Sequence, residues 1–270
     1  MKLAVKKLRP PFKCHGGKYY LCDWVIRNFP NGYEDMSYLE PFGGAASVLL
    51  NKRHSIKEMY NDLHQPTANI FSCLVHDAST MIQRIHAIEY KEDSFKAAQA
   101  VEFKFGSVNS AIAELVLRRM SRGGMKKAFS WSTRTRGGRP GDLNAWETFK
   151  SLLPLICDRL QKVEVYSKDA LELVEEHASN QMMLMYLDPP YLFKTRTAKS
   201  VYDCEMTDEE HKNLADKVKK VEGCVVISGY DSPLYRQLYH NWRWLTKEVP
   251  NNSGQGRIKQ RRVECLIMNY

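Results

Sequence analysis

The chain has 270 residues, 43% of them hydrophobic, which is enough for one large core in a single domain or in a catalytic domain with a small insert. Lysine and arginine outnumber aspartate and glutamate by 40 to 31, and the formal net charge of +9 is compatible with a polyanionic partner. The sequence has no apolar run of about 20 residues, no signal peptide and no cysteines at zinc spacing. We therefore expect a cytoplasmic protein with reduced, mostly buried thiols, without a membrane span or a metal site.

Strands and helices alternate in the N-terminal part of the chain. Hydrophobic periodicity predicts a strand at 36–39, a helix at 45–52, a second strand at 56–60 and a helix at 66–75. Such alternation is typical of an α/β fold with a parallel, doubly wound sheet, in which ligands bind at the carboxyl ends of the strands.

The alternation stops between residues 77 and 143. This region is first polar and helical, and then rich in glycine, serine and arginine. We therefore predict that residues 1–76 and 144–270 form a catalytic domain and that residues 77–143 form a small inserted domain.

The alternation resumes in the C-terminal part. Predicted strands lie at 163–166, 182–187 and 224–228, predicted helices at 169–177, 207–221 and 232–239, and a closing pair of strands at 242–249 and 263–269. The segment 182–187 has no polar interruption, which is typical of a parallel strand that is buried on both faces.

The strongest chemical signal follows this strand as Asp188-Pro189-Pro190-Tyr191. The two prolines fix the backbone, so that the Asp188 carboxylate and the Pro189 carbonyl become rigid acceptors. Two such acceptors suit the two N–H donors of an exocyclic amino group, and the ring of Tyr191 offers a flat surface to an extruded base. The alternative is a purely structural turn.

A glycine-containing turn follows the first predicted strand as Glu40-Pro41-Phe42-Gly43-Gly44. Glycine lets the backbone approach a ligand, and a helix that begins there would offer free N–H groups. The turn lacks the GxGxxG pattern, which argues against dinucleotide binding.

Three further segments have both a ligand-binding and a structural interpretation. Asp62 and Asp169 each follow a strand, where an acid accepts hydrogen bonds from ribose hydroxyls or caps a helix. Near the N-terminus, two glycines lie between Lys13 and Lys18. This loop is either a solvated basic turn or a segment that closes over a ligand carboxylate, with Lys18 as the charge partner.

In their order, the segments 13–18, 40–44, 61–62 and 188–191 resemble the Dam-like family of DNA adenine-N6 methyltransferases. The segments 227–231 and 263–270 resemble the end of that family's sequence, so the resemblance covers nearly the whole chain outside 77–143. Ala46 stands where the family usually has a glycine, His64 where many members have asparagine, and Cys14 where some have an aromatic residue.

The resemblance implies a Rossmann-like methyltransferase sheet of seven strands, S-adenosylmethionine as the methyl donor and the N6 amino group of a flipped adenine as the acceptor. It implies donor contacts at Cys14, His15, Gly16, Gly17, Lys18, Glu40, Pro41, Phe42, Gly43, Gly44, Asp62, Asp169 and Asp188, and a target-base site at Asp188, Pro189, Pro190 and Tyr191. It also places a target-recognition domain at 77–143.

The inserted region carries a basic segment that begins at Arg118 and ends at Arg139. It contains no acidic residue, and the next acid along the chain is Asp142. Lysine and arginine contact phosphates, and arginine also reads guanine edges. The predicted contacts to double-stranded DNA are Arg118, Arg119, Arg122, Lys126, Lys127, Arg134, Arg136 and Arg139, with Phe129 and Trp131 among them. The alternative is a flexible, solvated basic loop.

Other functions remain open at this point. Methylation of cytosine N4 needs the same chemistry, but Asp188 before the two prolines favours adenine, since the resembling family more often uses serine for cytosine. An RNA or protein-amide acceptor is disfavoured by the basic insert. A non-catalytic DNA-binding protein is disfavoured by the presence of Lys18, Asp62 and Asp188. A bacterial or phage origin and a companion restriction endonuclease are consistent with the family.

Overall fold

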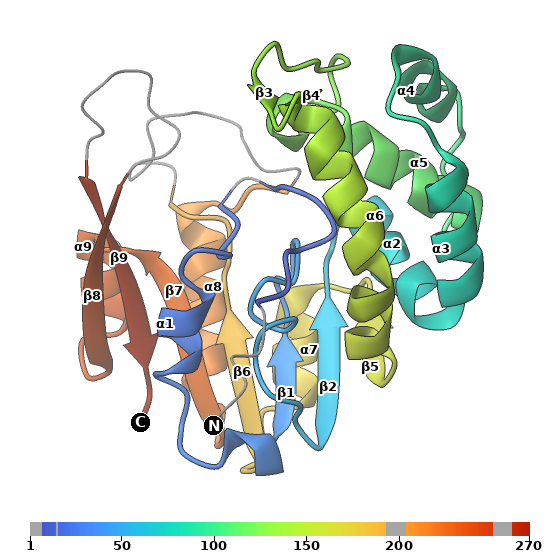
Figure 1. Ribbon diagram of the computed structural model, residues 1–270. Helices are drawn as coiled ribbons and strands as arrows, with labels where there is room; N and C mark the ends of the chain where they lie inside the picture. The colour runs from blue at the N-terminus through green and yellow to red at the C-terminus, as the bar shows by residue number, and fades with distance from the viewer. Residues whose placement is uncertain (1–6, 15, 193–203, 251–260) are drawn as a thin grey trace, which may run out of the picture. The chain divides into compact units, whose positions relative to one another are not determined.

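The computed structural model describes residues 7–14, 16–192, 204–250 and 261–270 (Figure 1). The chain forms two compact units. We call Met1–Ile26, Gly44–Arg53 and His64–Ser167 the helical unit, and Arg27–Gly43, His54–Leu63 and Lys168–Tyr270 the sheet unit. The predicted insert 77–143 lies inside the helical unit, which extends beyond it on both sides, so the predicted domain boundary stays a prediction.

The sheet unit is built on a mixed β-sheet. Its strands are β1 (Ser37–Glu40), β2 (Lys57–Asn61), β6 (Met183–Leu187), β7 (Cys224–Tyr230), β8 (Arg243–Pro250) and β9 (Arg261–Met268), in the order β2-β1-β6-β7-β9-β8. The first four in this order are parallel, whereas β9 is antiparallel to both β7 and β8. Among the described residues the sheet counts seven strands when β5 (Val163–Tyr166) of the helical unit is included. The predicted fold class and the closing strand pair are confirmed.

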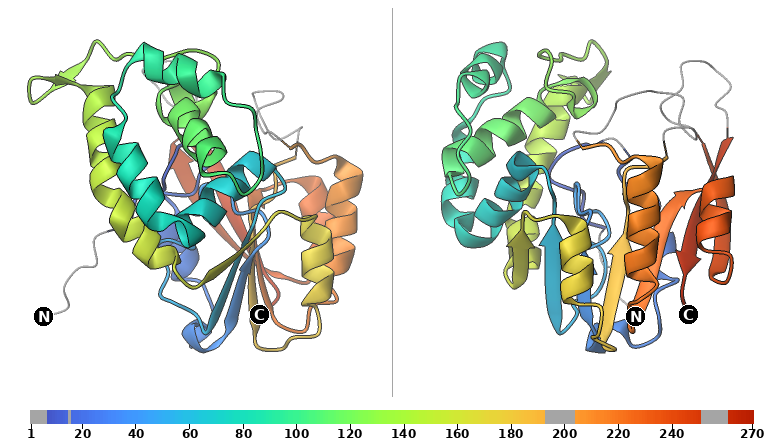
Figure 2. Two further views of the ribbon diagram at one scale, coloured as in Figure 1. Left: turned by 90° about the vertical axis from the view of Figure 1, so that its right-hand side faces the viewer. Right: turned by 180° about the vertical axis from the view of Figure 1, so that it is seen from behind.

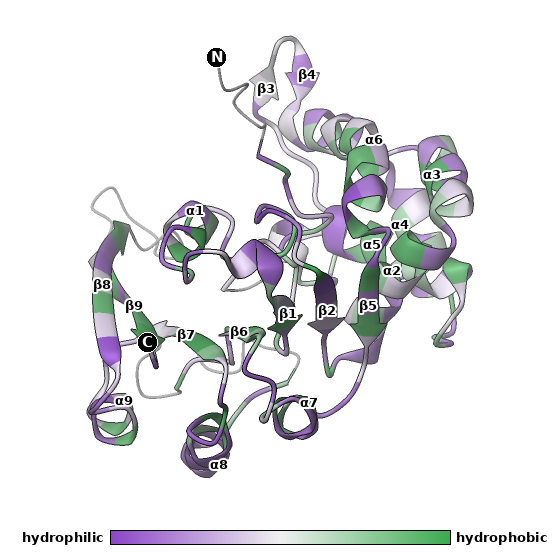
Figure 3. Ribbon diagram, turned by 90° about the horizontal axis from the view of Figure 1, so that it is seen from below, coloured by the Kyte–Doolittle hydropathy of each residue, from purple (hydrophilic) through white to green (hydrophobic). Residues whose placement is uncertain are grey.

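Central strands of this sheet are buried because helices cover the sheet and its residues are apolar. Every residue of β6 is buried, as its continuous apolar sequence predicts. The covering helices are α7 (Ala170–Glu176), α8 (Asp208–Val218) and α9 (Pro233–Leu238), and the first two pack side by side (Figure 2, right). In Figure 3, β6 is coloured as hydrophobic whereas α8 is largely hydrophilic, since only one stripe of that helix is buried.

Capping side chains set the helix starts in this unit. Thr207 and Glu210 form a reciprocal capping box at the start of α8, and Ser232 caps α9 through the backbone N–H of Tyr235. Asp169 caps α7. A short 3-10 helix, Tyr33–Asp35, precedes β1.

The helical unit contains α1 (Cys22–Ile26), α2 (Gln65–His76), α3 (Ala78–Ala87), α4 (Glu92–Gln99), α5 (Val108–Arg119), the 3-10 turn Arg122–Gly124, the hairpin of β3 (Thr135–Arg136) and β4 (Arg139–Pro140), and α6 (Gly141–Leu160). Its α2 packs against α5, and α3 packs against α6. The core between them is aromatic and aliphatic, with Phe71, Leu115 and Trp146 almost inaccessible to solvent.

One predicted element is wrong. Residues 45–52 form a series of turns rather than a helix, although Leu50 N–H donates to the Ala46 carbonyl and Lys52 N–H to the Val48 carbonyl. Gly44 and Ala46 both have left-handed backbones, with φ of 50° and 55°, and such residues interrupt the helical hydrogen-bond ladder. The other predicted elements are present with ends shifted by a few residues.

The described part of the chain holds no helix that is long and apolar enough to cross a membrane. In those same residues, no group of three or more His, Cys, Asp or Glu side chains is arranged to bind a metal ion. All seven cysteines are free thiols. Cys22, Cys73, Cys157 and Cys265 are buried, as expected for most of the cysteines.

We predict that the four buried thiols do not react in the native protein. Burial raises the pKa of Cys22, Cys73, Cys157 and Cys265 to about 11, so at pH 8 they are protonated, whereas the reactive form is the thiolate. An aromatic disulfide reagent at pH 8 should titrate at most Cys14, Cys204 and Cys224 before unfolding, and all seven cysteines in denaturant. A fourth fast-reacting thiol in the native protein would contradict this prediction.

Candidate active site

Glu40 ends β1 as a buried carboxylate. The Tyr38 hydroxyl donates a hydrogen bond of 2.8 Å to Glu40 Oε2. Burial first, and then the negative charge of Glu40, hold the pKa of Tyr38 well above its usual range. Tyr38 therefore stays a hydrogen-bond donor and fixes the Glu40 carboxylate at the carboxyl end of its strand.

The turn after β1 packs closely against the end of β2, where Gly43 contacts Tyr60 and Asn61. The Gly43 N–H donates to the Asn61 carbonyl at 2.8 Å. A Cβ atom at Gly43 would lie 2.0 Å from a ring carbon of Tyr60. Glycine at this position is therefore required by close approach of the backbone to an aromatic ring.

The side chain of Asn61 joins three segments at this edge of the sheet. Its Nδ2 donates to the carbonyls of Pro41 at 2.9 Å and Lys168 at 3.1 Å, and its Oδ1 accepts from the Lys168 N–H at 2.9 Å. These bonds bring the predicted donor contacts Asp62 and Asp169 to the same edge, because each follows one of the joined residues. Asn61 stands in one of the segments that carry the family resemblance, but nothing local in the sequence indicates this bridging role.

Asp62 and Asp169 differ in their surroundings. Asp62 is half-buried, whereas Asp169 is exposed and its Oδ1 accepts from the Leu171 N–H at 2.8 Å. The helix-capping interpretation of Asp169 is thus confirmed, and its contact to a ligand stays a prediction. Phe42, in the turn after β1, is half-buried.

Asp188 follows β6 and is held by the neighbouring strand. Ser228 Oγ donates to Asp188 Oδ1 at 2.6 Å, and it also lies 3.1 Å from the Tyr186 hydroxyl. The parallel register, with Leu187 opposite Ile227, places Asp188 beside Ser228. Pro189 is buried after Asp188, so side chain and backbone are both fixed at this point.

Tyr191 is held at both ends of its side chain. Its hydroxyl donates to Glu264 Oε2 at 2.8 Å, and its ring meets Tyr230 edge to face at a centroid distance of 4.6 Å. Sequence reasoning did not assign functions to Ser228, Tyr230 or Glu264. The only local signal was that they lie in the two C-terminal segments, 227–231 and 263–270, that resemble the methyltransferase family.

Carboxylates surround the buried phenol of Tyr186. Burial, and then the charge of Asp188, hold the pKa of Tyr186 well above its usual range, and Glu40 and Glu264 act in the same direction. The edge of the sheet unit therefore carries a concentration of negative charge and hydrogen-bond acceptors. Such an edge suits a ligand that brings N–H or O–H donors or a positive charge.

The predicted lysine–glycine loop lies in the helical unit. Lys18 is buried, and its Nζ donates to the Gly16 carbonyl at 2.8 Å. The Gly17 N–H donates to the Cys14 carbonyl at 3.4 Å, and a Cβ atom at Gly44 would lie 3.7 Å from Cys14 Sγ. The loop is thus a tight turn with Cys14 beside Gly44 of the same unit; His15 lies outside the described residues.

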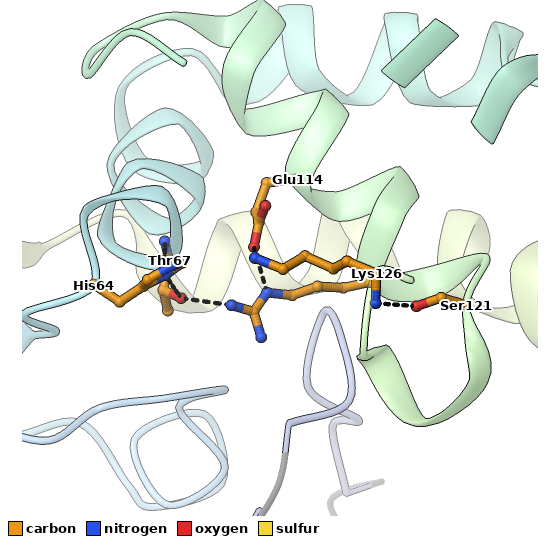
Figure 4. Close-up of polar contacts among 6 residues, drawn as sticks. His64, Thr67, Glu114, Ser121 and Lys126 are labelled. Atoms are coloured by element: carbon orange, nitrogen blue, oxygen red, sulfur yellow. Dashed lines mark hydrogen bonds and ion pairs between the residues drawn. The ribbon is translucent and has the colours of Figure 1, made fainter. Parts of the chain in front are cut away.

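The predicted DNA contact at Arg118 is wrong, because this side chain is buried in the helical unit. Its Nε donates to Glu114 at 2.7 Å and its Nη2 to Thr67 Oγ1 at 3.2 Å (Figure 4). Lys126 binds the same Glu114 oxygen at 2.9 Å, and His64 Nδ1 lies 2.9 Å from Thr67 Oγ1 (Figure 4). Arg118 therefore ties the start of α2 to α5.

Arg119 is half-buried and bonded within the helical unit, and its contact to DNA stays a prediction. Its Nη2 donates to the Ala145 carbonyl at 2.6 Å, and its guanidinium lies 4.4 Å from the ring centroid of Phe149. Burial lowers its pKa to about 10. The exposed cations of the basic segment are Arg122, Lys127, Arg134 and Arg139, and the side chain of Arg136 lies outside the described residues.

An aromatic cluster lies beside these exposed cations. Phe129 and Trp131 both contact the ring of Tyr90, whose own hydroxyl donates to the Ser130 carbonyl at 2.8 Å. Trp131 is 52% exposed. The basic segment thus combines solvent-exposed charge with an accessible indole ring.

We predict that Gly43→Ala destabilises the protein, because the added methyl group would overlap the ring of Tyr60. The expected loss in the free energy of unfolding is about 1–3 kcal/mol, measured by denaturant titration. Gly141→Ala is the matched control, since its nearest neighbour would lie at an ordinary 3.5 Å. Equal free energies of unfolding for Gly43→Ala and the wild type would show that the space between Gly43 and the Tyr60 ring accommodates a methyl group, which would contradict the prediction.

We predict that substitution of a buried arginine of the basic segment lowers stability, whereas substitution of an exposed one weakens DNA binding. Arg118→Gln leaves Glu114 in the interior without its closest partner and should cost about 3–5 kcal/mol of stability. Arg134→Gln should leave stability unchanged and weaken DNA binding. Denaturant titration and a DNA-binding assay on both variants check this, and weaker DNA binding by a fully stable Arg118→Gln would overturn the correction.

Two comparisons with known sequences identify the family of this chain. A family model described as D12 class N6 adenine-specific DNA methyltransferase matches residues 15–251. The DNA adenine methylase of Haemophilus influenzae is 22% identical over 285 aligned residues, which cover 97% of this chain and 93% of that protein.

Solved structures with partial similarity include a putative methylase from Haemophilus influenzae, with 13% identity, a TM-score of 0.38 and coverage of 93% of this chain and 87% of that one. An S-adenosylmethionine-dependent methyltransferase from Agrobacterium tumefaciens has 9% identity, a TM-score of 0.39 and coverage of 93% and 61%. An rRNA methyltransferase from Streptomyces viridochromogenes has 10% identity, a TM-score of 0.38 and coverage of 93% and 82%. Similarity this weak adds nothing to the assignment.

The family match confirms the resemblance that the motifs carry, and with it the adenine acceptor rather than cytosine. The chain belongs to the D12 class of N6 adenine-specific DNA methyltransferases and is an S-adenosylmethionine-dependent enzyme that methylates adenine in DNA.

Proposed function

We propose that Asp188 and the Pro189 carbonyl bind the amino group of a flipped adenine, with Tyr191 against the base. The observation that carries this proposal is the double fixation of Asp188, by Ser228 through its side chain and by Pro189 and Pro190 through its backbone. Two immobile acceptors orient an amino group that has two N–H donors. Orientation of this kind is worth about 7–11 kcal/mol of the barrier in favourable cases.

The methyl donor is proposed to bind along the same edge. Glu40, Asp62 and Asp169 supply acceptor oxygens for ribose hydroxyls and for the charged part of the donor, and Gly43 keeps the turn free of a side chain. Cys14, Gly16, Gly17, Lys18 and Gly44 of the helical unit, together with Pro41 and Phe42, stay proposed donor contacts. When bound, S-adenosylmethionine supplies an electrophilic methyl group on a positively charged sulfur.

The residues of the chain then act by position and charge. Asp188 and Pro189 accept the two N–H bonds of the amino group and direct its nitrogen lone pair away from the two acceptors. Positive charge develops on that nitrogen as the new bond forms, and the Asp188 carboxylate stabilises it. The amino nitrogen would attack the methyl carbon in line while the methyl–sulfur bond breaks and the neutral thioether leaves. The methylated nitrogen would then release one N–H proton to the Asp188 carboxylate that already accepts it, and no covalent bond to the protein would form.

Double-stranded DNA is proposed to bind through the exposed part of the basic segment. Arg122, Lys127, Arg134 and Arg139 are free to reach phosphates because they are exposed, and Trp131 offers a stacking surface among them. A bacterial or phage source, a cytoplasmic location and a companion restriction endonuclease stay predictions.

We predict that Asp188→Ala abolishes methyl transfer but leaves DNA binding within about twofold of the wild type, because Asp188 contacts one amino group rather than phosphates. The measurement is transfer of labelled methyl from S-adenosylmethionine to unmethylated DNA, followed by nucleoside analysis. Label should appear in N6-methyladenine. Asp216→Ala, at an exposed position of α8, is the control and should retain full activity.

Two outcomes would contradict the proposal. Retained turnover by Asp188→Ala would remove Asp188 from the target-base site. Label in N4-methylcytosine, or in RNA but not DNA, would show a different acceptor for the same chemistry.

A further inference from the structure

One face of the sheet unit carries a polar stripe that crosses four strands. Opposite residues in a sheet share a face, and so do residues two apart in one strand. The registers pair Tyr38 with Leu184, Leu187 with Ile227 and Tyr230 with Glu264. On β1, β6, β7 and β9 and at the residue after β6, the polar side chains of this face are Tyr38, Glu40, Tyr186, Asp188, Ser228, Tyr230, Arg262 and Glu264.

On β9, Glu264 of this stripe is hydrogen-bonded to Tyr191. Glu264 is only 7% exposed and accepts the Tyr191 hydroxyl proton at 2.8 Å, across 73 residues of sequence. Tyr230, directly opposite Glu264, contacts the ring of Tyr191 edge to face. Arg262 donates to the Tyr230 hydroxyl at 3.0 Å and lies 5.3 Å from its ring centroid.

Stability alone does not account for a glutamate at this position. A carboxylate that is removed from water is costly unless hydrogen bonds compensate for it, and a hydrophobic residue of similar volume often serves the core equally well. For Glu264, one of those compensating bonds comes from Tyr191, the side chain that is proposed to lie against the target base. The hydroxyl lies at the far end of the tyrosine side chain, on the axis about which the ring rotates, so a hydrogen bond at that atom fixes the direction of this axis.

We infer that Glu264 is a positioning residue for methyl transfer, which fixes the direction of the long axis of the Tyr191 ring through its hydroxyl, while the ring of Tyr230 packs against Tyr191 and limits rotation about that axis. The inference rests on the proposed role of Tyr191 at the target base. Glu264 itself touches neither the base nor the donor in this scheme. It acts through Tyr191, so its effect requires the tyrosine hydroxyl.

The test is a double-mutant cycle in kcat, with Glu264→Ala, Tyr191→Phe and the double variant in the full-length enzyme. Each single variant should lower kcat by about 10- to 100-fold through loss of ring alignment. The double variant should be no worse than the poorer single variant, because both changes remove the same bond. Dissociation constants for S-adenosylmethionine and for DNA should stay within about twofold of the wild type.

Glu264→Gln provides the conservative rescue. Its amide oxygen accepts from the tyrosine hydroxyl, so kcat should return to within about threefold of the wild type. Thermal unfolding of each variant separates positioning from folding. Wild-type kcat in Glu264→Ala, additive effects in the double variant, or a loss of kcat in Glu264→Gln as large as in Glu264→Ala would each overturn the inference.

Tyr191→Ala distinguishes this inference from the proposed function on which it rests. Full activity in Tyr191→Ala would remove Tyr191 from the target-base site and defeat both. Loss of activity in Tyr191→Ala, together with wild-type kcat in Tyr191→Phe and Glu264→Ala, would defeat only the inference, because the ring would then matter without its hydroxyl bond.

Discussion

The hydrogen bond from Ser228 to Asp188 is the interaction on which the arrangement of this edge depends. Its two residues are 40 positions apart and meet only because β6 and β7 are parallel neighbours with Leu187 opposite Ile227. A shift of one residue in that register would turn Ser228 to the other face of the sheet and leave the carboxylate without this donor. The sheet register therefore sets the position of the acceptor, and the two prolines keep the backbone there.

Polar groups within an apolar sheet are tolerated here because they satisfy one another. Tyr38 donates to Glu40, and Tyr191 donates to Glu264, each at 2.8 Å, so neither buried carboxylate is left without a donor. Networks of this kind lose much of their stabilisation when one member is removed. They also specify a single side-chain arrangement, which a site that depends on orientation requires.

Local patterns predicted most of the strands and the acceptor segment, and failed where long-range contacts decide. The buried run of β6 and the prolines after Asp188 are visible in the sequence because they act on the adjacent backbone. The left-handed backbone of Ala46 is not visible, so the turns at 45–52 were predicted as a helix. The partnerships of Arg118 with Thr67 and of Tyr191 with Glu264 depend on packing across 51 and 73 residues, which no local pattern encodes.

The division of the basic segment into interior and exterior side chains has a consequence for how binding responds to ionic strength. Each phosphate that a cation neutralises adds about 0.9 to the slope of log affinity against log salt. Arg118 is buried and bonded to Glu114, so under the proposed binding mode it would release no counterion from DNA. If the segment binds DNA as proposed, its contribution to the salt dependence would be shallower than its arginine content suggests.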